Sequence, residues 1–365
     1  MKKICHYLFA IATISMVASS CSKSDTTTTT VPAVTTLTVS VDKSTIVADG
    51  YDKAVITVKD QAGTDITSQC LLIVGGGAIS GNAISMEFGL HGSYEVYATK
   101  NSLTSNKVSV TVTNPGVSKY KTKVVAEDFT GAWCGWCPRL SYKFENFMTN
   151  NNRVYTVGVH NNDAYALPSI ESSLRARFGV TSFPTAVINR TRTFNDNGNI
   201  SSLADSTDMG TFLRKRMVAG LAINSVVAGN TLNVTTKVGF DASISQGLKL
   251  VVLLVQDGLV LPQINYYSNN ASYPGNPYFS AASPIANFVH KGVLRSTPTG
   301  ILGSDITASS QVKNGEFVAT NTIDISGMNV ANLKVVAFVV FADGQTKSGI
   351  LNAQWAAAGT NQAYD

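Results

Sequence analysis

Two cysteines separated by two residues stand between an apolar strand and a helix, and they constrain the middle of the chain most strongly. The strand is predicted at 123–129. After the cysteines, apolar residues recur at the spacing of one helix face, at Leu140, Phe144, Phe147 and Met148. A second strand at 154–160 and a helical stripe at 170–178 follow. Strands that alternate with helices predict an α/β unit with a mainly parallel sheet.

Cys134 and Cys137 admit four roles: haem attachment, zinc binding, a static disulfide and dithiol redox chemistry. Haem attachment needs a histidine after the second cysteine, where this chain has Pro138. Structural zinc needs four ligands, and only Cys70 and scattered histidines remain to complete the set. A disulfide this short removes little chain entropy. A helix N-terminus lowers a thiol pKa, and the second thiol can resolve a mixed disulfide, so we favour redox chemistry.

The segment EDFTGAWCGWCPR resembles the thioredoxin superfamily, in which a strand, W-C-x-x-C and a helix follow in this order. The resemblance makes Asp128 the buried carboxylate, six residues before Cys134. It also makes GVTSFPT the segment of the cis-proline, Pro184. It implies that Phe183 pairs through its backbone with a substrate peptide and that Pro184 faces the sulfurs. Both cysteines, Asp128 and Pro184 are therefore the expected catalytic residues.

Four further residues are assigned to substrate contact or to proton transfer. Trp133, Gly135 and Trp136 are expected to contact an unfolded client, although Trp133 can instead pack on the sheet. The dipeptide Gly135-Trp136 departs from the Gly-Pro of cytosolic thioredoxins. His160 ends a buried strand at the edge where open sheets place ligands, so it is a possible proton shuttle or a structural histidine. No functional role is assigned to His290 or to the pair Tyr266-Tyr267.

The N-terminal residues read as a secretory leader. Lys2 and Lys3 precede an apolar run that is too short to span a bilayer permanently. The small residues that end before Cys21 resemble the lipobox of bacterial lipoproteins, which implies cleavage after residue 20 and a lipid on Cys21. A plain signal peptide is the alternative. Ser22 favours the outer membrane by resemblance to lipoprotein sorting, and residues 21–34 form a Ser/Thr-rich tether.

Alternating strands predict a β-sandwich on each side of the α/β unit. Residues 35–113 resemble a bacterial immunoglobulin-like domain, in which the lone Cys70 is expected to be buried. The β pattern returns at 221–365. The predicted fold class is therefore multidomain α/β plus β, a thioredoxin-like α/β domain at 119–220 flanked by two antiparallel β-sandwich domains.

Charge and family resemblance complete the functional prediction. The net charge is +5, from 28 Lys and Arg against 23 Asp and Glu, with no basic stripe, so no nucleic-acid partner is expected. The leader, the cysteine segment and VVLLVQDGLVLPQ…NFVHKGVLR resemble the outer-membrane-protein-28-related lipoproteins.

The favoured function is a membrane-tethered thiol–disulfide oxidoreductase of the cell envelope. It would act on protein thiols or disulfides with a membrane or periplasmic redox partner, and without a metal or cofactor. The alternative is a non-catalytic surface or periplasmic binding or adhesion lipoprotein that uses its β-sandwich domains, with the thioredoxin-like unit as scaffold.

Overall fold

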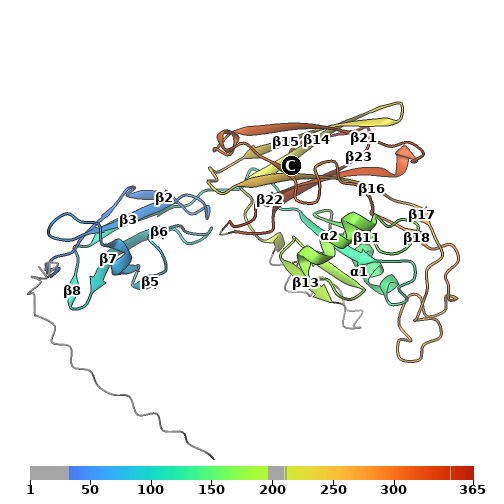
Figure 1. The fold of residues 1–365 in the computed structure, drawn as a ribbon, viewed down its shortest axis with the longest axis horizontal. Coiled ribbons are helices and arrows are strands. Elements are labelled where there is room, and N and C mark those ends of the chain that lie inside the picture. The colour runs from blue at the N-terminus through green and yellow to red at the C-terminus, as the bar shows by residue number, and fades with distance from the viewer. Residues whose placement is uncertain (1–32, 196–208, 210–211, 346) are drawn as a thin grey trace, which may run out of the picture.

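Strands dominate the computed structural model, which describes residues 33–195, 209, 212–345 and 347–365 (Figure 1). Strands account for 41% and helices for 11%. The predicted leader, Cys21 and nearly all of the tether lie outside the described residues. Within the described part of the chain, no helix is long and apolar enough to cross a membrane.

The N-terminal module consists of two sheets around one apolar core. The smaller sheet has the order β1(Thr38–Val41), β3(Ala54–Lys59) and β6(Ala83–Ile84). The larger sheet has the order β2(Thr45–Val47), β9(Val108–Thr113), β7(Gly92–Lys100), β4(Leu71–Val74) and β5(Gly77–Ile79), with β8(Leu103–Thr104) beside β7. A 3-10 turn at Thr67–Gln69 precedes Cys70, which is half-buried and packs against this core.

A nine-stranded sheet organises the rest of the molecule. Its order is β13(Arg192–Asn195), β12(Thr185–Ile188), β10(Val124–Thr130), β11(Val154–His160), β19(Val293–Ser296), β16(Leu248–Gln256), β22(Leu333–Phe341) and β23(Ile350–Ala357), with β20(Ser304–Asp305) beside β16. A four-stranded sheet has the order β21(Glu316–Asp324), β15(Thr231–Phe240), β14(Ala219–Ala228) and β24(Asn361–Gln362). The remaining elements are the pair β17(Leu259–Val260) and β18(Val289–His290), and 3-10 turns at Ala308–Ser310 and Val330–Asn332.

Both faces of the central strands are covered, which explains their uninterrupted apolar sequences. On β16, Leu250, Val252 and Leu254 share a core with the four-stranded sheet. The residues between them, Val251, Leu253 and Val255, share a second core with Leu174 of helix α2(Pro168–Phe178). Successive strand residues point to opposite faces, so one apolar run serves two layers.

Helix α1(Cys137–Asn150) packs on β10 and β11 through a separate core. Leu140 and Phe144 on one helix face meet Val124, Ala126 and Val154. Pro138 lies in the first turn, where the missing N–H leaves no hydrogen bond unmade. Helix α2 ends at Gly179, whose positive φ of 64° permits the left-handed C-cap.

The predicted thioredoxin-like α/β domain is wrong. Strands β10 and β11 are parallel, but β12 and β13 are antiparallel to their neighbours, and β11 continues through β19 into β16, β22 and β23. Residues 119–220 and 221–365 therefore share one mixed, mostly antiparallel sheet. The physical reason is that β11, which is buried on both faces, gains its second neighbour, β19, from the C-terminal part of the chain. The fold class is corrected to a β-rich protein with two helices in its described part.

Candidate functional site

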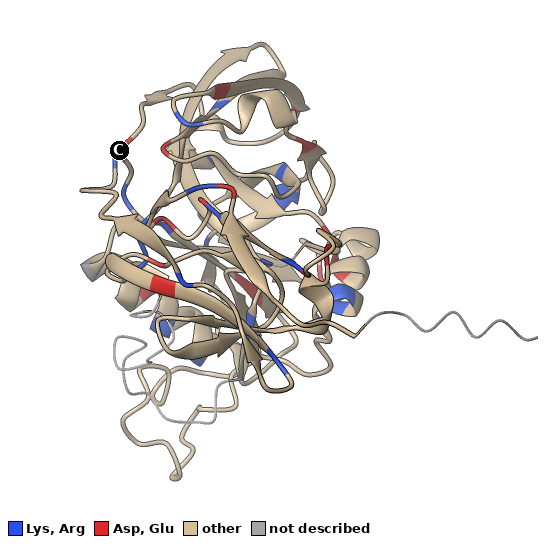
Figure 2. Ribbon diagram, turned by 90° about the vertical axis from the view of Figure 1, so that its left-hand side faces the viewer, with Lys and Arg blue, Asp and Glu red and all other residues tan. Residues whose placement is uncertain are grey.

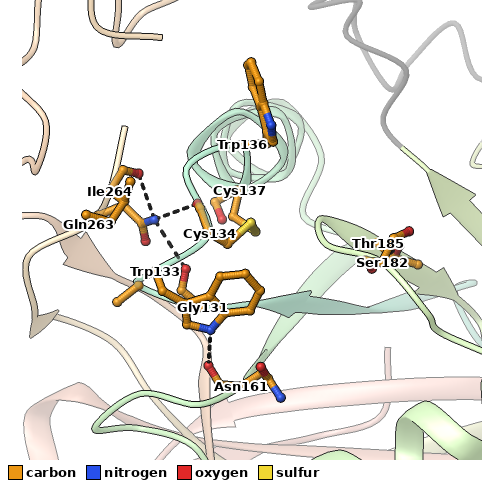
Figure 3. The surroundings of a disulfide bond; sticks show 12 residues. Gly131, Trp133, Cys134, Trp136, Cys137, Asn161, Ser182, Thr185, Gln263 and Ile264 are labelled. Carbon is orange, nitrogen blue, oxygen red and sulfur yellow. Dashed lines mark hydrogen bonds between the residues drawn. A yellow bond between two sulfur atoms is a disulfide. The ribbon is translucent and has the colours of Figure 1, made fainter. Parts of the chain in front are cut away.

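The two close cysteines form a disulfide at the start of α1 (Figure 3). The turn that leads into the helix is fixed by two backbone hydrogen bonds, from Cys134 N to Gly131 O at 2.9 Å and from Cys137 N to Cys134 O at 3.1 Å. Cys134 is 4% exposed and Cys137 is 1% exposed. The disulfide is therefore buried on the protein side of the turn.

A long irregular segment, residues 261–288, covers this turn, and we call it the capping segment. Ile264 N donates to Ala132 O at 2.8 Å, and Tyr266 N donates to Gly135 O at 3.0 Å. The Gln263 amide donates to Cys134 O at 2.9 Å and to Gly131 O at 3.3 Å, as Figure 3 shows. Backbone groups of the cysteine turn thus find their partners about 130 residues away in the sequence.

Aromatic contacts of Trp136 and Trp133 add to these hydrogen bonds around the cysteine turn. The ring of Trp136 meets Tyr266, Tyr267 and Tyr273 edge to face, with ring centres 5.2, 5.2 and 5.8 Å away. Trp133 packs on Phe183 at 5.4 Å, and its indole N–H donates to Asn161 O at 2.8 Å. Both tryptophans are engaged by protein groups, although they keep exposures of 43% and 36%.

The other residues assigned to catalysis lie nearby. Asp128 is 3% exposed, and Ser141 Oγ lies 3.3 Å from its Oδ2. The peptide bond between Phe183 and Pro184 is cis, and both residues are half-buried. In Figure 3, Ser182 and Thr185 lie on the opposite side of the disulfide from Gln263. Asp128 lies on β10, which leads into the cysteine turn, and it is paired with Ala186, two residues after Pro184.

This arrangement is suited to holding a turn in place. A redox enzyme needs a sulfur that a client thiolate can reach, because thiol–disulfide exchange proceeds by direct attack on sulfur. Here both cysteines are nearly inaccessible, and the capping segment closes over the turn. The thioredoxin and oxidoreductase predictions are corrected accordingly, since they rested on an α/β domain that the β-rich structure lacks.

His160 ends β11 and is held by a carboxylate. Its Nδ1 lies 2.7 Å from Asp163 Oδ2, which also accepts from Ala132 N at 2.9 Å. Burial raises the pKa of Asp163, but the hydrogen bonds from His160, Ala132 and Tyr165 outweigh it and lower that pKa overall. Asp163 is therefore an ionised acceptor, so the nitrogen of His160 that faces it, Nδ1, carries a proton and donates it.

His290 on β18 lies beside His160, with ring centres 4.9 Å apart. Its Nε2 lies 3.3 Å from the carbonyl oxygen of Leu261. Burial, and next the charge of His160, lower the pKa of His290 to about 4. His290 is therefore neutral at pH 7, with its proton on Nε2.

A cavity of about 430 Å³ opens between α1, the α1-facing side of β10 and β11, and residues 288–292. Small residues create this space, since Thr156 and Gly158 follow Val154 on the same face of β11. Strands β11 and β19 are paired at a single position, Gly158 with Val293, so the sheet is loosely closed here. A cavity of this volume is in the range of small-molecule pockets.

The cavity lining combines aromatic and polar groups. Phe144, Tyr155, Phe288 and Trp355 contribute rings, and both histidines line the cavity. Thr156 is 9% exposed, and its hydroxyl has no hydrogen-bond partner. Basic and acidic residues are interspersed along the ribbon (Figure 2). At this cavity Lys291 pairs with Glu145 and Lys334 with Asp257, and the buried carboxyl group of Asp128 also lines the wall.

The sequence assignments missed the parts of this site that depend on distant contacts. His290, Asp163 and Thr156 carry no motif, and the capping segment has no periodicity. One feature of the sequence could have indicated the site. Thr156, Gly158 and His160 occupy alternate positions of a strand whose other residues are apolar, so they lie on one face of it. Among the described residues, no group of three or more His, Cys, Asp or Glu side chains could hold a metal ion.

The chain is similar to known proteins in two of three comparisons. The family described as outer membrane protein Omp28 matches residues 171–362. No curated protein matches the chain significantly. HBP35 of Porphyromonas gingivalis has a TM-score of 0.53 and 20% identity, over 66% of this chain and 76% of that chain. Protein AGR_C_4864 from Agrobacterium tumefaciens has a TM-score of 0.41 and 13% identity, over 68% and 99%.

These likenesses differ in what they establish. The similarity to HBP35 concerns the fold alone at this level of identity, and the second TM-score is too low for any argument. The family match covers more than half of the chain and points to an outer-membrane family rather than to the thioredoxin superfamily.

Proposed function

The chain belongs to the outer membrane protein Omp28 family, and we propose that it acts as a non-catalytic binding protein of the cell envelope. One observation carries this proposal. An open cavity of about 430 Å³ is lined in part by the helix that begins at the disulfide, whose two cysteines are 4% and 1% exposed. The cavity is available to a ligand, whereas the sulfurs are not available to a client thiol.

In this function the cysteine turn is a scaffold. Helix α1 begins at Cys137 and supplies Ser141, Phe144 and Glu145 to the cavity wall. The disulfide and the capping segment hold the first turn of that helix, so they fix the wall on which a ligand would lie. The capping segment also leads into β18, which brings His290 to the cavity.

A lipid on Cys21 would tether this binding protein to the membrane, with the Ser/Thr-rich residues 21–34 as a flexible spacer. The family places the protein at the outer membrane or elsewhere in the envelope, and the anchor is part of the proposal. Membrane fractionation tests the anchor. The variant Cys21→Ala is expected to be released, and retention of this variant in the membrane fraction would refute lipidation.

Insulin reduction with dithiothreitol tests the absence of catalysis. Wild type and Cys134→Ser are expected to give the same rate as dithiothreitol alone. A faster rate for wild type would contradict the proposal. The variant Cys137→Ser provides a second readout, because it would trap mixed disulfides with any client, and none is expected.

Binding of an aromatic dye tests the cavity itself. Anilinonaphthalene sulfonate combines fused rings with one polar group, as the aromatic and polar lining requires. Gly158→Val should abolish its binding, because a methyl carbon at this position makes ordinary contacts of 3.5 to 3.8 Å and the rest of the side chain enters the cavity. The matched control is Gly275→Ala, which meets nothing within 4 Å. Equal dye binding by all three proteins would contradict a binding role for the cavity.

A further inference from the structure

We propose that His160 and His290 form a two-histidine site for a divalent transition-metal ion at the wall of the cavity. The inference rests on the proposed binding function and deepens it by naming a class of ligand. It starts from the nitrogen atoms that face no protein partner. Within the described part of the chain, His160 Nε2 and His290 Nδ1 have no protein hydrogen-bond partner.

The partners of the two rings fix their tautomers. Asp163 accepts from His160 Nδ1, and the Leu261 carbonyl accepts from His290 Nε2. A metal ion would bind the other nitrogen of each ring and displace any proton that this nitrogen carries. Histidines that bind metals almost always donate their second N–H to a carboxylate or a backbone carbonyl, and this pair has one of each.

The spacing of the rings suits one shared ion. Their centres are 4.9 Å apart and their planes meet at 74°. Two imidazoles bound to one ion through nitrogen at about 2.0–2.1 Å have ring centres on the order of 5 Å apart. Both rings line the same cavity, so an ion there would be reached from the open side.

The chemistry of the donors selects the ion. Neutral imidazole suits copper, zinc and nickel, and affinity in such sites is highest for Cu²⁺. Mg²⁺ prefers oxygen ligands and water. Because no third His, Cys, Asp or Glu joins the pair among the described residues, water would complete the coordination from the cavity.

Packing of neutral rings is the competing explanation for this pair. His160 and His290 both contact the ring of Tyr165, at 5.8 and 6.0 Å, and Phe288 lies 4.9 Å from His290. Packing explains the burial of the rings. It does not account for the hydrogen bonds that both rings make with Asp163 and Leu261, which hold each ring by one nitrogen and leave the other without a protein partner among the described residues.

Titration of the full-length protein with Cu²⁺ alone tests the site, with Mg²⁺ as the control ion. The background carries Cys5→Ser, Cys21→Ser and Cys70→Ser, because a cysteine outside the Cys134–Cys137 disulfide could bind copper through its own thiol. One Cu²⁺ is expected, with an electron paramagnetic resonance spectrum split by two nitrogens. His160→Gln and His290→Gln should each weaken binding at least tenfold and leave one nitrogen in the spectrum. The matched control His91→Gln is exposed in the N-terminal module and should change neither readout.

Asp163→Asn tests the carboxylate as a positioning residue. It should weaken copper binding by about 10–100-fold while the spectrum keeps two nitrogens. The inference is overturned if the double variant His160→Gln/His290→Gln binds Cu²⁺ as tightly as its parent. Dye binding by that double variant separates the metal site from the binding function of the cavity. If the double variant loses copper binding but still binds the dye, both proposals are supported. If it binds the dye and its copper affinity is unchanged, only the metal site is overturned.

Discussion

The backbone N–H of Tyr266 donates to the carbonyl oxygen of Gly135 at 3.0 Å, so the capping segment lies directly on the turn between the two cysteines. The approach is close enough that a Cβ at Gly135 would lie 2.4 Å from the Tyr266 ring. No real Cβ contact is that short. A residue that the sequence assigned to substrate contact is therefore needed for packing within the protein.

Replacing this glycine should loosen the cap. Gly135→Ala forces the Tyr266 ring away, and overpacking of this kind costs about 1–3 kcal/mol. Urea unfolding measures the loss, and the rate of disulfide reduction by dithiothreitol should rise in parallel. Gly275→Ala, in the same segment but with no neighbour within 4 Å, should change neither quantity. Unchanged reduction of Gly135→Ala would show that the segment does not shield the sulfurs.

Removing the disulfide should weaken the protein without abolishing binding. A loop this short accounts for about 2 kcal/mol in the chain-entropy description. Cys134→Ala/Cys137→Ala is therefore expected to lose about that much stability in urea while it still folds and binds the dye. Loss of dye binding by a folded double variant would contradict the scaffold role.

Local patterns predicted many elements, but not their partners. The apolar strand before Cys134 and the strand at 154–160 are present as β10 and β11, and α1 begins at Cys137. The error lies in the neighbours of β11. A strand buried on both faces has the same apolar sequence whether its neighbours come from its own domain or, like β19, from a distant segment. The capping segment was not predicted because it has no periodic apolar pattern. Its conformation depends on hydrogen bonds to residues that are distant in the sequence.

A buried ion pair tests whether residues 119–365 fold as one unit. Arg190 pairs with Glu127 of β10, donates to Ile301 O, and lies 4.8 Å from the Phe338 ring of β22. Glu127→Gln removes one partner of a pair whose side chains are 2% and 5% exposed, which costs about 3 kcal/mol. Urea unfolding should show one shifted transition for the fluorescence of Trp133 and Trp355.

The exposed pair Glu95–Lys107 provides the control for that experiment. Glu95→Gln lies in the N-terminal module and should leave the same transition where it is. Two separate transitions in Glu127→Gln, one for each tryptophan, would contradict the shared sheet.

Acid should destabilise the protein through His290. Its folded pKa of about 4 lies below the ordinary histidine value of 6.5, so the unfolded chain binds more protons between these values. Stability from this group is therefore present above about pH 6.5 and is lost as the pH falls towards 4, by on the order of 2 kcal/mol. Urea midpoints between these pH values should depend less on pH in His290→Gln. His91→Gln should keep the wild-type dependence, and an unchanged slope in His290→Gln would refute the assignment.

Dye binding by two variants in one titration decides whether the ligand site is the cavity or the cysteine turn. We expect that Gly158→Val, which fills the cavity, loses the dye. We also expect that Cys134→Ala/Cys137→Ala, which removes the disulfide, keeps it with an affinity close to that of wild type. The opposite result, with the dye retained in Gly158→Val and lost in the folded cysteine variant, would place binding at the cysteine turn and contradict the account.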